Sequence, residues 1–286
     1  MKILVTGSNG QLGSEFKKLS KTSIHQFFFA DFTKLDITDI ESIKSFFKEN
    51  PPDFILNCAA YTAVDKAEDE KKKAFSVNKT GVLNLVEICE KYNIKLIHFS
   101  TDYVFDGKNH RPYKESDCTK PNSVYGKSKL EGENIIMQSD ISALIIRTSW
   151  LYSVYGNNFV KTMINLGQSK DEISVVFDQI GTPTNARDLA EATMKCLKYT
   201  KNWENTRKIY HFSNEGVASW YDFAKVIFDT YKLKCFIFPV LSNAYPTKAK
   251  RPYFSVLDKS KFKEDFKVTI KHWKSSFQSC EFNYES

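Results

Sequence analysis

The chain has 286 residues, a formal net charge of +7 and 42% hydrophobic residues, which suffices for one large domain or two closely joined ones with a packed core. The early apolar run at 27–30 is far too short to cross a bilayer, and the sequence opens directly with a strand pattern, so we expect neither a transmembrane segment nor a signal peptide. Six cysteines are scattered without a zinc-type spacing, which favours reduced thiols in a cytoplasmic protein.

The positive charge is spread along the chain. Its one dense run, EDEKKKAF at 68–75, places acidic before basic residues on an expected helix, which is typical of a solvated face. No motif indicates a nucleic-acid partner, and none indicates a membrane partner. The modest positive excess instead suits a small substrate that carries phosphate.

In chain order, the first half alternates short apolar segments with helical ones. Strands are expected at 2–7, 25–30, 52–60, 94–100 and 142–150, and helices at 11–19, 38–50, 73–93 and 123–138. The helix at 38–50 opens with Thr38 and has Glu41 three residues later, a capping-box pattern. Apolar strands separated by helices predict an α/β fold, namely a Rossmann-like doubly wound parallel sheet.

In the second half of the chain, strands and helices alternate less regularly. Helices are expected at 157–168, 185–199 and 219–232, and strands at 173–178, 208–213 and 235–240. We expect residues 1–150, joined by 183–212, to form a dinucleotide-binding domain. Residues 151–182 and 213–286 would then form a smaller C-terminal substrate-binding lobe over the carboxyl edge of the sheet.

A glycine-rich loop follows the first strand. Gly7, Gly10 and Gly13 have the spacing GxxGxxG rather than the usual GxGxxG of dinucleotide-binding loops. Glycines allow a tight turn, and the following helix start offers free N–H groups to a pyrophosphate. Asp31 ends the second strand, where a carboxylate can accept hydrogen bonds from ribose hydroxyls and favours NAD. Lys34 lies close to it, so NADH and NADPH both stay open.

A third pattern indicates carbonyl reduction. Tyr125 and Lys129 are four residues apart on an expected helix and therefore share one face. Thr101 follows the fourth strand, at the sheet edge where such folds bind ligands. Thr101 would hydrogen-bond a ketone oxygen and Tyr125 would protonate it. Lys129 would lower the pKa of Tyr125 and hold the nicotinamide ribose. A lone Tyr-x-x-x-Lys is common by chance, but the glycine loop and Thr101 in chain order favour catalysis.

These segments resemble the extended short-chain dehydrogenase/reductase superfamily and, within it, the dTDP-4-dehydrorhamnose reductase family. The resemblance covers most of the chain and rests on TGSNGQLGSE, NCAAYTAVDKAED, STDYVFDG, VYGKSKLEGE, RTSWLY, GNNFVKTM, DQIGTPT and RPYFSVLD. It implies reduction, with NADP(H) or NAD(H), of the C4 ketone of dTDP-4-dehydro-L-rhamnose or a close 4-keto-6-deoxysugar nucleotide. The pathways implied are dTDP-rhamnose and polysaccharide biosynthesis.

The resemblance also assigns roles to matching positions. Cofactor contacts are implied for Gly10, Gln11, Leu12, Asp31, Asp36, Ile37, Ala60, Tyr61 and Thr62. The sugar would be contacted by Thr101, Asp102 and Trp150, and the diphosphate by Arg251, whose planar fork suits it. Trp150 as a core aromatic and Arg251 as a surface cation remain alternatives.

Two departures from the family pattern stand out. The segment before Tyr125 reads KPNSVYG, where the family usually has Leu-Asn before VYG. Some members carry Mg²⁺ at a dimer interface, and Glu15 matches one of those positions. The segment 184–192 offers no convincing partner for Glu15, so no metal is predicted, while a homodimer stays open.

Two other functions fit the same fold. Sugar-nucleotide epimerases and 4,6-dehydratases are similar, but dehydratases place an Asp-Glu pair after the threonine, whereas here Tyr103 follows Asp102. The second is a non-catalytic subunit resembling the β subunit of methionine adenosyltransferase. The complete set of Thr101, Tyr125 and Lys129 argues against it.

Overall fold

The central feature of the molecule is a six-stranded sheet with the order β10-β5-β4-β3-β1-β2, in which all neighbours are parallel. The computed structural model describes residues 1–48, 51–199 and 204–282. The strands of this sheet are β1 (Lys2–Thr6), β2 (Gln26–Ala30), β3 (Phe54–Asn57), β4 (Lys95–Thr101), β5 (Ala143–Thr148) and β10 (Arg207–His211). From the central strand β1 the chain first adds β2 on one side, and then adds β3, β4, β5 and β10 in turn on the other side. The fold class expected from the sequence is confirmed.

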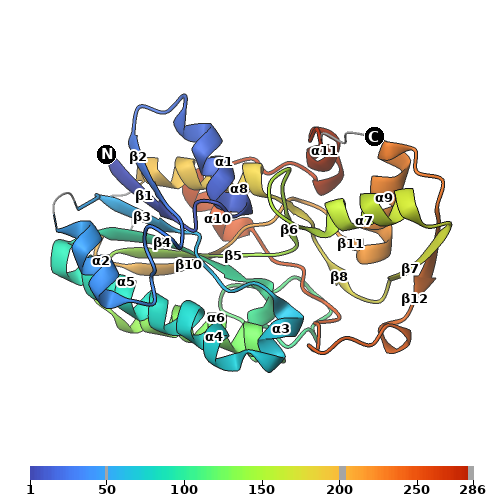
Figure 1. The fold of residues 1–286 in the computed structure, drawn as a ribbon, viewed down its shortest axis with the longest axis horizontal. Helices are drawn as coiled ribbons and strands as arrows, with labels where there is room; N and C mark the ends of the chain where they lie inside the picture. The colour runs from blue at the N-terminus through green and yellow to red at the C-terminus, as the bar shows by residue number, and fades with distance from the viewer. Residues whose placement is uncertain (49–50, 200–203, 283–286) are drawn as a thin grey trace.

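Helices cover both faces of the sheet (Figure 1). One face carries α1 (Gln11–Ser20), α8 (Ala186–Cys196) and α10 (Ser260–Phe266), and the other carries α2 (Ile40–Phe47), α5 (Gly81–Tyr92) and α6 (Val124–Gln138). The strands are buried on both sides by two separate apolar cores, which explains why they read as continuous apolar runs.

A second, smaller group of elements lies beyond the carboxyl edge of the sheet (Figure 1). It contains α7 (Phe159–Ser169), α9 (Trp220–Tyr231), α11 (Trp273–Gln278) and the parallel pair β7 (Glu172–Val176) and β12 (Phe236–Val240). Two short pairs join it to the rest: β6 (Leu151–Tyr152) with β9 (Thr184–Asn185), and β8 (Ile180–Gly181) with β11 (Ala218–Ser219). These elements have an apolar core of their own. Because β10 joins the large sheet and α8 packs on α1, the chain returns to the first group before α9.

Several expected elements have different bounds. The helix expected at 38–50 begins at Ile40 and is capped by Asp39, which accepts a hydrogen bond from the Glu41 amide at 2.9 Å. The capping box at Thr38 was therefore wrong, because the Thr38 hydroxyl instead donates to Asp36. Residues 49–50 of that expected helix lie outside the described residues.

The long helix expected at 73–93 is three segments rather than one. It consists of α4 (Lys71–Phe75), a π-helical turn η1 (Ser76–Thr80) and α5. The pattern also missed α3 (Val64–Asp69), α10, α11 and the 3-10 turns η2 (Asp102–Val104) and η4 (Ser242–Ala244). These elements are short, and each contains too few residues to show a repeating pattern of apolar positions. Within the described ranges, no helix is both long and apolar enough to cross a membrane.

Candidate active site

The glycine loop wraps closely around neighbouring backbone. Gly7 has a φ of +59°, and a Cβ added there would lie 2.6 Å from the Ala59 backbone nitrogen. A Cβ at Gly13 would lie 2.6 Å from the Gly7 carbonyl oxygen. Helix α1 then begins after Gly10, with no side chain capping its first N–H groups. This is the arrangement that binds a phosphate anion at a helix start.

A cavity of about 460 Å³, here called the loop cavity, opens beside this loop. Its lining includes the expected cofactor residues Gly7, Gly10, Asp31, Asp36, Ile37, Ala60 and Tyr61. Asp31 accepts hydrogen bonds from the Thr33 hydroxyl at 2.7 Å and from Asn9 Nδ2 at 2.5 Å. Hydrogen bonding, chiefly from Thr33, holds the pKa of Asp31 below its usual value. The carboxylate is therefore ionised at neutral pH and able to accept further hydrogen bonds.

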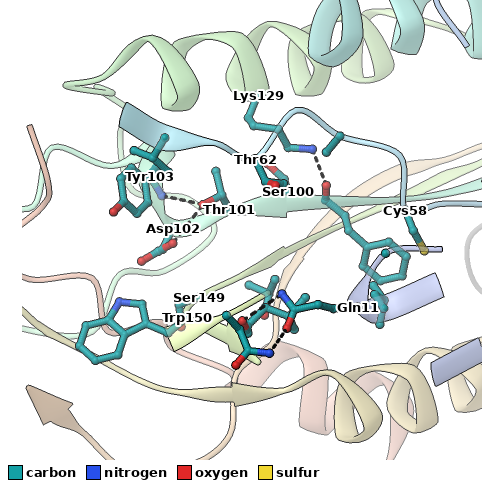
Figure 2. A pocket seen from close by; sticks show the side chains of 18 of the residues that line it. Gln11, Cys58, Thr62, Ser100, Thr101, Asp102, Tyr103, Lys129, Ser149 and Trp150 are labelled. Carbon is teal, nitrogen blue, oxygen red and sulfur yellow. Dashed lines mark hydrogen bonds between the residues drawn. The ribbon is translucent and has the colours of Figure 1, made fainter. Parts of the chain in front are cut away.

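A second cavity of about 600 Å³, the central cavity, contains the three expected catalytic residues. It shares Gly10, Cys58 and Ala60 with the loop cavity, so the two are adjacent. The catalytic three are Thr101, Tyr125 and Lys129, and the other expected residues that line the cavity are Gln11, Leu12, Gly13, Thr62, Asp102 and Trp150. Figure 2 shows Thr101, Asp102 and Lys129 around this space, with Gln11 and Trp150 on its other side.

Thr101 and Asp102 lie where β4 ends and η2 begins. The Thr101 hydroxyl donates to Asp102 Oδ1 at 3.0 Å and accepts from the Tyr103 amide at 3.2 Å. Asp102 is 2% exposed, and its Oδ2 has no partner among the described residues. Burial raises the pKa of Asp102 to about 6, and the nearby Ser255 and Thr101 side chains offset that rise only in part.

Tyr125 lies in the first turn of α6, which is capped by Ser123. Desolvation raises the pKa of Tyr125 to about 12, the Thr101 hydrogen bond lowers it, and the charge of Asp102 raises it further. The sequence led us to expect that Lys129 lowers the pKa of Tyr125, whereas in the folded protein burial raises it. The Lys129 amine donates to the Phe99 carbonyl oxygen at 2.6 Å. Burial lowers the pKa of Lys129 to about 8.

Trp150 enters the central cavity from an unusual backbone conformation. It has a φ of +46°, and its ring stacks on Trp220 with 3.5 Å between centroids and 6° between planes. A Cβ on Gly181 would lie 2.6 Å from the Trp150 ring, so only glycine fits beneath it. The sequence indicated Trp150 but neither Trp220 nor Gly181, because α9 and β8 approach it only in the folded chain.

Arg251 lines a third cavity of about 490 Å³, the lobe cavity, rather than the central one. The two cavities share Thr62, Val64, Tyr103 and Trp220. Arg251 Nη2 lies 2.7 Å from Asp65 Oδ2 and its Nη1 lies 3.1 Å from Asp65 Oδ1. Arg251 therefore lies in the wall of a cavity that adjoins the central one. Its ion pair with Asp65 was not visible in the sequence.

Glu15 lies away from these cavities. Ser153 donates to its carboxylate at 2.5 Å, and burial raises the pKa of Glu15. In the part of the chain that the structure describes, no cluster of three or more His, Cys, Asp or Glu side chains is placed to hold a metal ion. The expectation of no metal stays a prediction.

Comparison with known proteins gives a consistent result. The family model described as RmlD substrate binding domain matches residues 1–285. The dTDP-4-dehydrorhamnose reductase of Aggregatibacter actinomycetemcomitans is 41% identical, with 97% of each chain covered.

Two solved structures agree in fold and length. A dTDP-4-dehydrorhamnose reductase from Clostridium acetobutylicum superimposes with a TM-score of 0.92 at 41% identity, with 97% of each chain covered. One from Bacillus anthracis, in complex with NADP, has a TM-score of 0.90 at 37% identity, again with 97% of each chain covered. From the matched length, the identities and the shared fold, we conclude that this chain belongs to the dTDP-4-dehydrorhamnose reductase family.

Proposed function

We propose that this chain uses NADPH or NADH to reduce the C4 ketone of dTDP-4-dehydro-L-rhamnose, or of a closely related 4-keto-6-deoxysugar nucleotide. The observation that carries the proposal is that Thr101, Tyr125 and Lys129 line one cavity next to the glycine loop. The names of its relatives support the same reaction and substrate class.

The described residues fit a nicotinamide dinucleotide. At Gly7 and Gly13 a side chain would collide with backbone, so the loop leaves room for a close approach. We assign the pyrophosphate to the close approach that the loop allows at Gly10 and to the N–H groups of Gln11 and Leu12 at the start of α1. The adenosine end is assigned to Asp31, Asp36, Ile37, Ala60 and Tyr61, and the nicotinamide end to Thr62, Tyr125 and Lys129. A bound nicotinamide supplies the hydride that reaches C4.

The hydride brings both electrons and one hydrogen, and the side chains supply the proton that completes the alcohol. Because its pKa is raised to about 12, Tyr125 is protonated at neutral pH and acts as the acid that gives its proton to the ketone oxygen. Thr101 orients that oxygen by a hydrogen bond. The charge of Lys129 stabilises the negative charge that develops on the ketone oxygen and on the phenol. Solvent returns the proton to Tyr125 after the alcohol leaves.

The nucleotide sugar is assigned to the space between the two groups of elements. Asp102 and Trp150 line the central cavity where the sugar would lie. Arg251 lines the adjoining lobe cavity and would pair with the diphosphate. On this proposal residues 1–150 and 183–212 bind the dinucleotide, and 151–182 and 213–286 bind the substrate. A homodimer and a cytoplasmic location remain predictions.

The test uses purified protein, NADPH or NADH, and enzymatically generated dTDP-4-keto sugar, followed at the nicotinamide absorbance band. One cofactor oxidised for each sugar reduced is expected, and Tyr125→Phe should reduce kcat by roughly 10²- to 10⁴-fold, the usual contribution of a positioned acid. Tyr103→Phe is the matched control, since its ring lies edge-on to that of Tyr125 at 5.5 Å. It should retain at least about a tenth of the activity, because a phenol that transfers no proton contributes little.

Three outcomes would contradict the proposal. Full activity of Tyr125→Phe would overturn the assignment of the acid. A changed sugar without net cofactor oxidation would indicate an epimerase or dehydratase. No turnover together with co-purification of a catalytic partner would indicate the non-catalytic subunit.

A further inference from the structure

A row of four buried polar side chains lies behind the central cavity. The Thr6 hydroxyl is 2.7 Å from Asn57 Oδ1, and Asn57 Nδ2 is 3.0 Å from His98 Nδ1. His98 Nε2 is in turn 3.2 Å from the Lys129 amine. None of the four is more than 2% exposed. They come from β1, β3, β4 and α6, so only the packing of α6 on the sheet brings them together.

When Lys129 is charged, its hydrogen bonds determine which atoms of this row carry a proton and which accept one. The ammonium has three N–H donors, and the Phe99 carbonyl oxygen takes one of them at 2.6 Å. For His98 to take a second, its Nε2 must be an acceptor. Its proton must then be on Nδ1, because burial, and next the Lys129 charge, place the pKa of His98 well below its usual value and keep the ring neutral.

If His98 Nδ1 carries the proton, the Asn57 side chain has to present its oxygen, as an acceptor, to that nitrogen. With the Asn57 nitrogen facing the ring, Nε2–H and the ammonium would be two donors in contact, which is costly in a buried site. A half-turn of the amide exchanges its oxygen and nitrogen without changing its outline. Asn57 then accepts from His98 Nδ1–H and donates to Thr6, whose hydroxyl can accept as well as donate.

We propose that His98 is a positioning residue: it accepts a hydrogen bond from Lys129 through Nε2, in a tautomer fixed by Asn57 and Thr6, and so directs the third N–H of Lys129 into the central cavity. The inference rests on the proposed function, because the cavity is where that reaction would occur. A neutral Lys129 keeps the same two bonds and turns its lone pair into the cavity. The amine can therefore lose and regain a proton without leaving a buried donor unpaired.

Other titratable side chains also face Lys129, from its own helix and from neighbouring strands. Two titratable neighbours, Glu133 one turn along α6 and the Cys58 thiol after β3, raise its pKa, against the larger lowering by burial; burial keeps the Cys58 thiol itself neutral by raising its pKa. Arg147 from β5 holds Glu133 in an ion pair of 2.6 Å, and Tyr125 precedes Lys129 by one helical turn. His98 differs from these groups because it is the side chain in hydrogen-bond contact with the amine.

Two amide variants separate the two ends of the imidazole. His98→Gln places an amide near the position of Nε2 and can still accept from Lys129. His98→Asn places one near Nδ1, keeps the contact with Asn57 and loses Lys129. We expect kcat in His98→Asn to fall by about 10- to 100-fold below the wild type, as for a displaced catalytic group. In His98→Gln, kcat should be at least about 10-fold higher than in His98→Asn.

The pH profile distinguishes positioning from a structural role. Activity in the direction of reduction should decline as pH rises through the Lys129 pKa of about 8, because the positive charge is lost. Losing an acceptor destabilises the Lys129 ammonium and lowers its pKa, so in His98→Asn the decline in activity should begin at lower pH. In the same variant, KM for NADPH should change less than kcat. In His98→Gln the decline should lie near that of the wild type.

A second measurement does not depend on activity. Long-range ¹⁵N–¹H spectra of the wild-type protein at pH 6.5 report which ring nitrogen of His98 carries the proton. The expected result is Nδ1–H with an unprotonated Nε2. A proton on Nε2, or equal kcat and pH profiles in the two amide variants, would overturn the inference. If the wild type reduces no keto sugar, the proposed function fails, while the spectrum still decides the tautomer. The spectrum also decides it if His98→Asn does not fold.

Discussion

Arg251 and Asp65 form a two-pronged ion pair across 186 residues of sequence. Asp65 lies in α3, beside the carboxyl edge of the sheet, and Arg251 lies in the segment that follows η4. The Asp65 carboxylate also accepts from the Ala249 amide at 3.0 Å. The hydrogen bond from Arg251 holds the pKa of Asp65 below its usual value, so the pair persists at neutral pH. The cation proposed to meet a diphosphate thus already has an anionic partner.

Releasing Arg251 should strengthen binding of the nucleotide sugar. Asp65→Asn keeps an oxygen for the Ala249 amide and removes the competing charge. A partly exposed ion pair is worth up to about 1 kcal/mol, so KM for the sugar should fall by about 3- to 5-fold with kcat unchanged. Steady-state kinetics measure this. Asp69→Asn, which removes a partner of Lys248 instead, is the control. A higher KM in Asp65→Asn would mean that Asp65 orients the guanidinium.

Asp102 should make the stability of the protein depend on pH. Its folded pKa of about 6 lies above the ordinary value of 3.8. Both states are protonated below about pH 4, and the unfolded state loses its proton first as pH rises. The free energy of unfolding therefore falls as pH rises from 4 to 6. Above pH 6 the total loss stays at about 3 kcal/mol.

Asp102→Asn removes this titration. Urea unfolding at pH 4 and pH 7 should show the variant gaining about 2 kcal/mol relative to the wild type between the two pH values, because part of the effect is already present at pH 4. A difference between the two proteins that does not change with pH would show that Asp102 is not the group responsible.

The buried pair of Glu133 and Arg147 should be important for stability. Their side chains are 2% and 3% exposed, and Ser100 also donates to Glu133 at 2.5 Å. Glu133→Ala leaves Arg147 charged and unpaired in the interior, which should cost about 3–5 kcal/mol in urea unfolding. Asp229→Ala, which removes an exposed partner of Lys225, should cost less than about 1 kcal/mol. Equal losses in the two variants would contradict the predicted importance of burial.

The Trp150–Trp220 stack should report on occupation of the central cavity. Gly181→Ala places a methyl group within 2.6 Å of the Trp150 ring, so the ring has to move. We expect KM for the nucleotide sugar to rise at least about 10-fold, as for a misplaced contact residue, with NADPH affinity unchanged. Tryptophan fluorescence should change when the sugar binds the wild type and change less in Gly181→Ala. A normal KM in this variant would exclude Trp150 from the sugar site.

Local patterns were sufficient for the parts of the site that lie close together in sequence. Gly7 and Gly13 surround one strand–helix turn, and Tyr125 and Lys129 share a face because one helical turn separates them. Thr101 ends a strand whose apolar run is evident. Such features depend on backbone periodicity and turn chemistry, which a short stretch of residues specifies by itself.

Local patterns were less reliable where side chains compete for the same backbone groups. Thr38 and Asp39 are adjacent and both can cap a helix, and the fold uses Asp39. The helix expected at 73–93 has the correct apolar face, but its π-helical turn at Ser76–Thr80 is a matter of packing. The Asn78 side chain in that turn bonds both the Tyr61 amide and Ser128.

The sequence by itself therefore determined the fold class, the glycine loop and the three proposed catalytic residues, because strand and helix periods are set within a few residues. Only the tertiary structure decided the environment of those residues. It directed Lys129 to His98 and the Phe99 carbonyl, placed Trp220 on Trp150, paired Arg251 with Asp65 and raised the pKa of Tyr125. Desolvation and contacts between distant segments depend on which surfaces meet, and that is settled only when the whole chain packs.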